Sequence, residues 1–478
     1  MAQAYELVIG LEIHAQMNTK TKMFCHCDNS SFESLPNTNV CEVCMGFPGM
    51  LPTINEEAVI KGIKAGLALG CTIPAYSKFD RKHYFYPDSP KGYQITQFDQ
   101  PIAINGEVEI DLADGTTKKI GIERLHLEDD AGKLIHSGMG TLVDFNRAGT
   151  PLMEIVSHPH LFSKEEASQY ARMVQQIVRY SGASDADMEK GMMRFDLNIS
   201  LRPAGTEAFG QRVEVKNLNS FRSLEKAIMF EMTRQAEILD SGGTIAKETR
   251  GWDAEKEITE SQRSKEAAAD YRYFPEPDLP PIITTPEQIE HIRQSLPELP
   301  RAKRKRYTRV FSIDSDYARI ISEDHSIAHY FEEMMNATNA YITASNLFIS
   351  DLLGHLNQRG ETIASSPIKP KQLAELASLI NDGTLSSKMG KEVLLIMLET
   401  KQDAHTIVEE KGLRQVTDLA SLETACQKAI EQLPKAAEDV RTGNDKAIGA
   451  LVGIVMKETK GQANPGKVNQ ILLHMLRS

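Results

Sequence analysis

The sequence predicts an α+β protein in which a sheet-rich N-terminal part is followed by a helical C-terminal part. In several segments before about residue 295, apolar and polar residues alternate, as in strands that are buried on one face. Beyond that point, apolar residues recur at the spacing of a helix. Between the two parts lies "YFPEPDLPPIITTPEQIEHIRQSLPELP", whose prolines cannot continue a helix and therefore mark a boundary.

The first predicted strand has the sequence "LVIGLEIHAQM" and covers residues 7–17. Its apolar face consists of Leu11, Ile13, Ala15 and Met17. Its polar face consists of Glu12, His14 and Gln16. Residues two apart on one face lie roughly 7 Å from each other, near enough to share a metal ion or a phosphate. The alternative is a polar face that only meets solvent.

Further segments have polar faces of the same kind. They are "IERLHLEDDAGK", "VDFNRAGTPLMEIV", "MMRFDLNISLR" and "VEVKN". Their acidic residues include Glu128, Asp129, Glu154, Asp196 and Glu214. A solvated face would more often carry Lys, Thr, Ser and Gln than this concentration of carboxylates, Asn and Arg. The pattern therefore favours a functional site.

If these polar faces belong to one sheet, their carboxylates and one imidazole converge. Such groups repel each other at neutral pH unless a hard divalent cation neutralises them. Mg²⁺ that is held by carboxylates usually keeps positions for water and nucleotide phosphate, and nearby Arg and Lys stabilise a phosphoryl group in transit. The sheet is then a floor for phosphoryl transfer. The sequence has no GxxxxGK[ST] loop, so a nucleotide would bind without that phosphate cradle.

Helices are predicted where capping residues precede an apolar stripe. The segment "SKEEASQYARMVQQIVRYSG" begins with Ser163 and Glu166, the pattern of a capping box, and ends at Gly182. Its stripe of Tyr170, Val174, Ile177 and Val178 should pack against the sheet. Near the C-terminus, residues 446–457 and 466–476 repeat such stripes, which indicates a small terminal helical module.

Composition and charge narrow the class of protein. The chain has 478 residues and a net charge of −12, which argues against wholesale coating of nucleic acid. No apolar run approaches the ~20 residues of a membrane span, and the N-terminus has no signal-peptide pattern, so we expect a cytoplasmic protein. Basic residues gather in "RAKRKRYTR", residues 301–309, and after Arg441. A solvated helix face is the simple interpretation of such runs.

Four of the six cysteines cluster in the sequence. "CHC" at 25–27 and "CEVC" at 41–44 are compatible with a structural Zn²⁺ held by Cys25, Cys27, Cys41 and Cys44. Four thiolates close the coordination sphere, so this site would have no open position for chemistry. His26 is a possible substitute ligand because CxC is a tight spacing, and four unligated thiols are the alternative.

Two stretches resemble the signatures of a known family, the B subunit of the tRNA-dependent Asp-tRNA/Glu-tRNA amidotransferase. They are "SKFDRKHYFYPDSPKGYQITQFDQP", residues 77–101, and "DYRYFPEPDLPP", residues 270–281. Further similar motifs run along the chain: "GLEIHAQM", "HLEDDAGK", "VDFNRAGTPLMEIV", "VKNLNSFR", "ETRGWD" and "VMKETKGQANP". One departure is Lys190 in "MEKGMMRFDLN", where a second acidic residue would match the family.

The resemblance implies a fold and a domain order. It implies a cradle domain at 1–295, built on an antiparallel sheet and related to glutamine synthetase and guanido kinases. A helical domain at 296–405 and a helical tail domain at 406–478, which meets tRNA, would follow.

The resemblance also implies an activity, that of a carbon–nitrogen ligase with glutamine as amido donor. ATP phosphorylates the side-chain carboxylate of Glu-tRNA(Gln) or Asp-tRNA(Asn), and ammonia then displaces the phosphate. By the same resemblance, the Mg²⁺ ligands are Glu12, His14, Asp129 and Glu214, with Glu128, Glu154 and Asp196 nearby. The nucleotide or the tRNA end would meet Lys82, Tyr84, Tyr86, Lys91, Tyr93 and Arg147.

The resemblance places glutamine hydrolysis on other chains. The sequence has no convincing Ser-Ser-Lys amidase stretch, and Cys71 in "ALGCTIP" is typical of a core residue. An amidase-type A subunit would supply ammonia through an internal channel, and a small C subunit would complete a heterotrimer. Two alternatives stay open: a tRNA-binding scaffold whose carboxylates position metal for a partner, and a free-standing ligase for small molecules. The sequence does not indicate which misacylated tRNA is physiological.

Overall fold

The computed structural model describes residues 5–32, 34–138, 140–264, 271–413, 418–459 and 462–477. The chain divides into two compact units, Met1–Pro300 and Arg301–Ser478. The first unit combines a large, mainly antiparallel sheet with helices, and the second is helical. The α+β class is confirmed at this level. The three-domain division with a further boundary at residue 405 stays a prediction.

An eight-stranded sheet forms the centre of the first unit, in the order β13-β12-β11-β10-β1-β9-β6-β5. Neighbouring strands are antiparallel except β11 and β12, which are parallel. Its strands are β1 (Tyr5–Gln16), β5 (Ala103–Asp111), β6 (Thr117–Asp129), β9 (Pro151–Ser157), β10 (Met193–Pro203), β11 (Val213–Leu218), β12 (Glu248–Asp253) and β13 (Ile258–Ser264).

The same unit has three small sheets, in the orders β14-β3-β4, β15-β2 and β7-β8. Their strands are β2 (Tyr76–Ser77), β3 (Asp80–His83), β4 (Tyr93–Thr96), β7 (Lys133–Ser137), β8 (Gly140–Asp144), β14 (Phe274–Pro275) and β15 (Ile282–Ile283). Strand β4 packs against β6, so this part of the chain reaches the large sheet.

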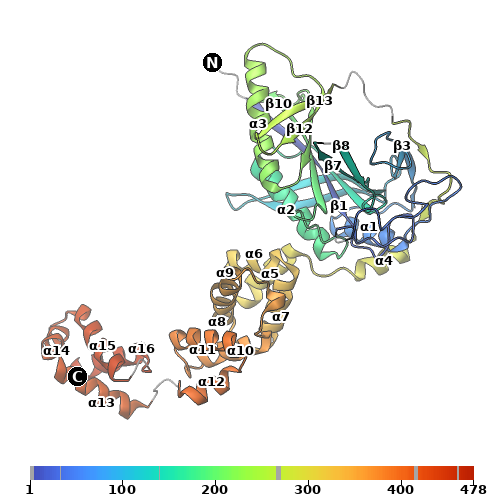
Figure 1. Cartoon of the computed structure of the whole chain (residues 1–478). Coiled ribbons are helices and arrows are strands. Elements are labelled where there is room, and N and C mark those ends of the chain that lie inside the picture. Colours follow the sequence, from blue (N-terminus) through green and yellow to red (C-terminus); the bar gives the residue numbers. More distant parts are fainter. Residues whose placement is uncertain are drawn as a thin grey trace. The chain divides into compact units, whose positions relative to one another are not determined.

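Helices α2 and α3 lie along one face of the large sheet, and α1 packs against β5 and β6 (Figure 1). The helices of this unit are α1 (Glu56–Ala68), α2 (Lys164–Tyr180), α3 (Phe221–Asp240) and α4 (Pro286–Gln294). The prediction for α2 is correct. Ser163 accepts a hydrogen bond from the Glu166 backbone nitrogen, although the Glu166 side chain accepts from Phe162 rather than closing the box on Ser163.

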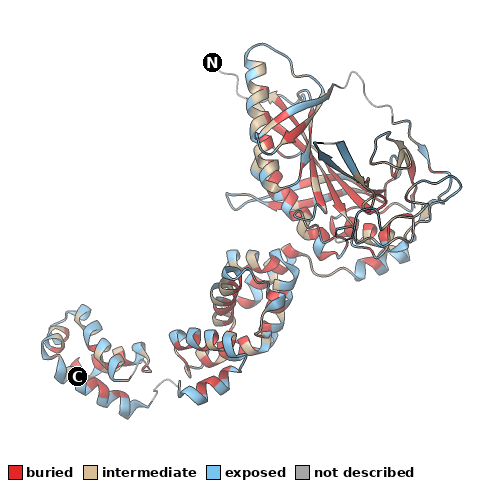
Figure 2. Ribbon diagram, in the orientation of Figure 1, coloured by how far each residue is buried: buried red, intermediate tan, exposed pale blue. Residues whose placement is uncertain are grey.

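The helix-covered face of the sheet forms the core of this unit. On β1, the odd-numbered residues Leu7 to Ala15 are buried, and on β10 the odd-numbered residues Met193 to Leu201 are buried with them. The stripe of α2 packs against them as predicted. Figure 2 shows the central strands buried and the β7–β8 hairpin exposed. The alternation that fills the core also places the even-numbered polar residues on the opposite face.

The second unit consists of helices with their own apolar contacts. They are α5 (Pro300–Phe311), α6 (Ser315–Glu323), α7 (His325–Asn336), α8 (Tyr341–Asn346), the π-helix η2 (Leu347–Leu353), α9 (Gly354–Gln358), the 3₁₀ helix η3 (Ile363–Ser365), α10 (Pro370–Asn381), α11 (Ser387–Thr400), α12 (Ala404–Lys411), α13 (Leu419–Gln432), α14 (Pro434–Arg441), the 3₁₀ helix η4 (Asp445–Ala447), α15 (Ile448–Glu458) and α16 (Pro465–Arg477). Residues from α13 to α16 form one core cluster, which includes the predicted stripes of α15 and α16.

Several cations of the basic run on α5, residues 301–309, bind residues of the same unit. Lys303 and Arg306 both bind the Glu332 carboxylate on α7. Arg304 donates to the Ser322 hydroxyl over 2.8 Å. Part of this run therefore has a structural role, because it joins α5 to α6 and α7. Among the described residues, no helix is long and apolar enough to cross a membrane.

Candidate active site on the polar face of the sheet

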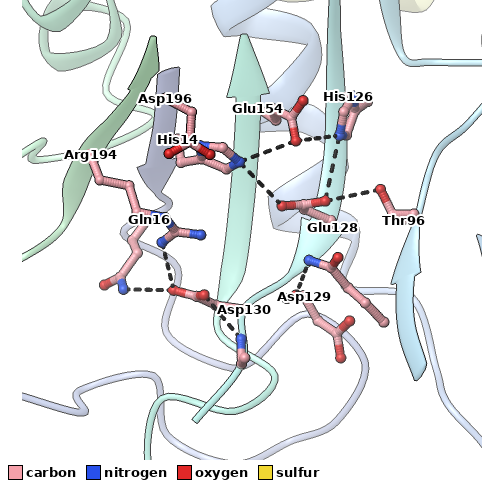
Figure 3. Close-up of polar contacts among 12 residues, drawn as sticks. His14, Gln16, Thr96, His126, Glu128, Asp129, Asp130, Glu154, Arg194 and Asp196 are labelled. Carbon is pink, nitrogen blue, oxygen red and sulfur yellow. Dashed lines mark hydrogen bonds and ion pairs between the residues drawn. The ribbon is translucent and has the colours of Figure 1, made fainter. Parts of the chain in front are cut away.

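Strand register brings a first cluster together on the polar face of the sheet. Glu154 on β9 is the register partner of both His14 on β1 and His126 on β6. Its Oε2 lies 3.1 Å from His14 Nε2 and 3.2 Å from His126 Nε2 (Figure 3). Glu128 completes the group, with Oε1 4.0 Å from His14 Nε2 and Oε2 3.5 Å from His126 Nε2. Thr96 on β4 donates to Glu128 Oε2 over 3.0 Å.

The first cluster is buried and charged. Burial opposes ionisation of Glu154, but its interactions with His126 and His14 hold the pKa of its carboxyl well below the usual range. Burial likewise opposes the charged form of His126, but Glu154 and Glu128 raise the pKa of its imidazole to about 9. Ligand atoms of His14, Glu128 and Glu154 lie within 4.8 Å of one another. This donor set of two carboxylates and an imidazole fits a divalent cation.

A second cluster includes Glu12, which precedes His14 by two residues on β1 and so lies on the same face. Glu12 is the register partner of Asp196 on β10, and Glu214 on β11 pairs with the next polar residue, Asn198. Oxygens of Glu12, Asp196 and Glu214 lie within 4.8 Å of one another. Burial and the charge of Glu154 raise the pKa of the Glu12 carboxyl. Crowded carboxylates of this kind attract a cation.

One lysine and two neutral donors surround the second cluster. Lys216 Nζ lies 3.0 Å from Asp196 Oδ2 and 3.1 Å from Glu214 Oε1. Burial opposes its charge, but the two carboxylates raise the pKa of the Lys216 ammonium. Asn198 donates to Glu12 Oε1 over 2.9 Å, and Thr249 donates to Glu214 Oε2 over 2.8 Å. Lys216 therefore occupies part of the space where a cation would reside.

The predicted Mg²⁺ ligands are divided between these clusters. His14 belongs to the first, and Glu12 and Glu214 belong to the second, with Glu128, Glu154 and Asp196 beside them. Asp129 belongs to neither cluster. Its carboxylate binds Lys91 Nζ and accepts a hydrogen bond of 2.8 Å from the Ile95 backbone nitrogen. Because Asp129 follows Glu128 directly, the two side chains leave opposite faces of β6, and they meet neighbouring residues of β4, Ile95 and Thr96.

The other predicted contact residues lie in separate settings, and of these Lys82 interacts with the first cluster. Lys82 is half-buried, and Glu128 raises the pKa of its ammonium although burial opposes this. The rings of Tyr84 and Tyr86 stack with centroids 5.8 Å apart, and Lys91 Nζ lies 5.9 Å from the Tyr93 ring centroid.

Arg147 has a different setting, because its guanidinium donates to the carbonyls of Ala131 and Gly132 over 2.9 and 2.7 Å. These two hydrogen bonds stabilise the loop that follows β6.

Sequence reasoning missed several residues of the site. His126 shares a face with Glu128 in an alternating segment, so the same periodicity could have found it. Lys216 follows Glu214 by two residues and has the same signal. Thr96 and the stacked pair Phe98 and Tyr273, with centroids 4.1 Å apart, had no signal in the strand periodicity, although all three lie within the two family signatures.

A cavity of about 390 Å³ adjoins the second cluster. Its lining includes Glu12 and Asn198 from that cluster, together with Ser157 and Ser200. Arg124, Arg212 and the exposed ring of Phe209 also line it. Arginines, hydroxyls and an exposed ring are groups that bind phosphates, sugars and bases.

The four clustered cysteines belong to neither of the two carboxylate clusters. The sulfurs of Cys25, Cys27, Cys41 and Cys44 lie within 4.8 Å of one another. Tetrahedral Zn–S bonds of about 2.3 Å require sulfurs roughly 3.8 Å apart, so small side-chain adjustments accommodate the ion. A hydrogen bond from Cys25 is the main cause that lowers the pKa of the Cys44 thiol. The donor set therefore fits a structural zinc ion.

Comparisons with known proteins cover most of the chain. Residues 7–290 match the family described as "GatB/GatE catalytic domain", and residues 329–476 match the one described as "GatB domain". Three relatives are each named as the B subunit of aspartyl/glutamyl-tRNA(Asn/Gln) amidotransferase. That of Carboxydothermus hydrogenoformans is 48% identical over 98% of both chains. That of Persephonella marina is 49% identical over 99% of this chain and 100% of its own. That of Picosynechococcus is 47% identical over 99% and 98%.

Proposed function

Since the chain belongs to the family of B subunits of aspartyl/glutamyl-tRNA(Asn/Gln) amidotransferase, we propose that its polar sheet face activates the misacylated amino acid for amidation. The proposal has one main support: two adjacent acidic clusters, six residues in all, on one face of a single sheet. Each subsequent assignment of a residue, cofactor or partner is part of this proposal.

The reaction has two steps. A free carboxylate is a poor electrophile, so ATP first transfers its γ-phosphoryl group to the side-chain carboxylate of glutamate or aspartate on tRNA. An acyl phosphate forms, and ADP leaves. The lone pair of ammonia then attacks the carbonyl carbon, the bond from this carbon to the phosphate oxygen breaks, and loss of a proton yields the amide and inorganic phosphate. The acyl phosphate also hydrolyses, so the site must exclude water.

The two clusters are the candidate sites for divalent cations. His14, Glu128 and Glu154 would hold one ion, and Glu12, Asp196 and Glu214 would hold another. Bound Mg²⁺ would neutralise phosphate charge during transfer. Asp129 has less geometric support as a ligand, because Lys91 and the Ile95 nitrogen already bind its carboxylate. His126 orients Glu154 and Glu128 through its Nε2.

The substrates would approach the clusters from different directions. The cavity beside Glu12 and Asn198 has the volume and polar groups for part of the nucleotide. Lys216 would pair with transferred phosphate when a cation displaces it from the carboxylates. On the side of the first cluster, Lys82, Tyr271 and Tyr273 offer a cation and ring faces to the aminoacyl end of tRNA.

The remaining parts of the chain would have supporting roles. The sheet unit would be the cradle domain, related in fold to glutamine synthetase and guanido kinases. Residues 296–405 would form the helical domain, and residues 406–478 would form the tail that contacts tRNA, supported by the separate core of α13 to α16. Zinc in the cysteine cluster would be structural.

Partner chains would supply the ammonia. An amidase-type A subunit would hydrolyse glutamine, the amido donor, and a small C subunit would hold the heterotrimer together. The purified chain alone should therefore hydrolyse no glutamine, and appreciable glutaminase turnover by it would contradict the proposal.

The decisive experiment follows γ-phosphate release in the reconstituted complex with each misacylated tRNA. We expect release that depends on Glu-tRNA(Gln) or Asp-tRNA(Asn) and disappears with Glu12→Gln or Glu214→Gln, while tRNA binding persists. Glu6→Gln is the matched control, because Glu6 lies on the same strand and binds Arg202 over 3.0 Å, away from both clusters. Unchanged release in Glu12→Gln and Glu214→Gln would instead support a scaffold that only positions tRNA.

A further inference from the structure

Lys22 is a charged side chain with no exposed surface, and it lies beside the cysteine cluster. Burying an ammonium costs free energy unless the charge is compensated. Lys22 Nζ donates to the Asn39 carbonyl over 2.6 Å and to the Ala148 carbonyl over 2.7 Å. Both acceptors are neutral, and no carboxylate of the described residues forms an ion pair with this ammonium. The compensating charge must come from another group.

The third neighbour of the ammonium is sulfur. Cys44 Sγ lies 3.8 Å from Lys22 Nζ, within hydrogen-bonding reach for a sulfur acceptor. Cys44 is the buried member of the four cysteines, and its sulfur also accepts a hydrogen bond of 3.2 Å from the Cys41 backbone nitrogen. Two N–H groups from different segments therefore point at one sulfur atom.

A zinc tetrathiolate needs such a partner. Four thiolates and Zn²⁺ carry a net charge of −2, and groups that donate hydrogen bonds to metal ligands strengthen metal binding. We propose that Lys22 is a positioning residue of this zinc site, with its ammonium compensating the thiolate charge and directing an N–H group at Cys44 Sγ. The inference rests on the proposed zinc ion and is independent of the amidation chemistry.

The same lysine links the metal site to the sheet unit. Ala148 lies in the turn between β8 and β9, and the following residue, Gly149, accepts a hydrogen bond of 2.8 Å from the Met23 backbone nitrogen. Lys22 therefore joins the loop that carries the cysteines, residues 25–46 (the cysteine loop), to the turn before β9. It binds the first through the Asn39 carbonyl and the second through the Ala148 carbonyl. A zinc site held in this way would stabilise the turn before β9, the strand that carries Glu154 of the first cluster.

The test measures zinc release from the purified complex to a colorimetric chelator. Lys22→Met keeps the aliphatic stem and removes the charge, and we expect zinc release roughly 10–100 times faster than from the wild type. In complexes loaded with Co²⁺, the sulfur-to-metal charge-transfer band should shift in Lys22→Met. Lys22→Gln, which keeps a donor for the carbonyls, should show the same two changes if Lys22→Met does not fold.

Asn146→Ala is the matched control. Asn146 accepts from the Asn39 nitrogen over 2.8 Å and donates to the Leu35 carbonyl over 2.6 Å, so it ties the same loop without touching sulfur. We expect zinc release from this variant to stay within about threefold of the wild type, with an unshifted Co²⁺ band. Wild-type release and spectra in Lys22→Met and Lys22→Gln, or equal effects in Asn146→Ala, would overturn the inference. A wild-type complex without zinc would overturn the zinc site as well, and γ-phosphate release would still test the amidation proposal.

Discussion

Asp130 follows β6 at the edge of the polar sheet face, where its carboxylate is buried among cationic and polar partners. Arg194 Nη1 lies 3.4 Å from Asp130 Oδ2, and Gln16 donates to the same oxygen over 3.1 Å (Figure 3). Arg147 Nε lies 3.6 Å from the same oxygen. Burial opposes ionisation, but Arg194 and Arg147 lower the pKa of the Asp130 carboxyl below its usual range. The strand ends of β1, β6 and β10 are thus joined by one ionised group.

Asp130→Asn should destabilise the protein in a pH-dependent way. Because the folded-state pKa is lowered, the ionised group stabilises the fold above the unfolded pKa, and this contribution disappears as pH falls through the folded pKa. Removing one partner of a buried ion pair costs about 3–5 kcal/mol. Urea unfolding should therefore show a loss of about that size at pH 7 and a smaller loss near pH 3.

Glu107→Gln is the control for this measurement, since Glu107 forms an exposed ion pair with Lys119. Its effect should be small at both pH values. An equal loss for Asp130→Asn at pH 7 and pH 3 would contradict the assignment of its pKa.

Strand alternation predicted which face of a strand the side chains of the site occupy, but not which residues they contact. It placed Glu12, His14, Glu128 and Asp196 on polar faces, and the structure brings these faces together on one sheet. Asp129, which only the family resemblance assigned as a Mg²⁺ ligand, keeps that role as a prediction. It follows Glu128 directly, so alternation alone places it on the opposite side of the strand, where it meets Lys91.

At the scale of elements, the cysteine loop packs closely on the segment that leads into β4. Gly46 has a positive φ of 70°, and an added Cβ would lie 2.8 Å from Lys91 Cγ and 2.9 Å from Lys91 Cα. Lys91 in turn binds Asp129 at the end of β6. The cysteine loop therefore fixes the position of a lysine that contacts the large sheet.

Gly46→Ala should disturb this contact, and Gly49→Ala should not. Gly49 has a similar φ of 86°, but nothing lies within 4 Å of an added Cβ. Both substitutions should cost about 1–2 kcal/mol of backbone strain. Gly46→Ala should cost about 1–3 kcal/mol more, because the new methyl group overlaps Lys91. Thermal or urea unfolding of the two variants measures the difference, and equal stability losses would contradict the close packing.

The predictability of elements depended on how local their signals are. Helix α2 was predicted from Ser163 and an apolar stripe, which are local features of the sequence. The small β14-β3-β4 sheet had no such signal, because Phe274 of β14 pairs with Arg81 of β3 across a long stretch of chain. Thr96 reaches Glu128 only through this arrangement.

At the scale of the whole molecule, the sequence pattern changes from strand alternation to helical spacing near residue 295. The first compact unit ends at Pro300. Strand order was not visible, because sequence alternation shows which face is buried but not which strands are neighbours. One shared sheet was a supposition from the polar faces, and the register of β6, β9, β1 and β10 supplies its geometry.

Deleting residues 406–478 should weaken tRNA binding and its dependence on salt. Six cations and only two acidic residues lie between Arg441 and the C-terminus. The slope of log affinity against log salt should fall by about 0.7–0.9 for each phosphate contact that is lost. Filter binding at several salt concentrations measures this slope, with nucleotide binding to the same complex as the control. An unchanged slope would contradict a tRNA-binding role for the tail.

The most direct test of the account counts divalent cations on the polar sheet face. The complex is freed of Mg²⁺ and titrated with Mn²⁺, and free Mn²⁺ is measured by electron paramagnetic resonance. We expect Glu154→Gln to weaken binding at the first cluster and Glu214→Gln to weaken it at the second, while Glu6→Gln binds like the wild type. If Glu154→Gln and Glu214→Gln both bound as many Mn²⁺ ions as the wild type with unchanged affinity, the clusters would not be cation sites.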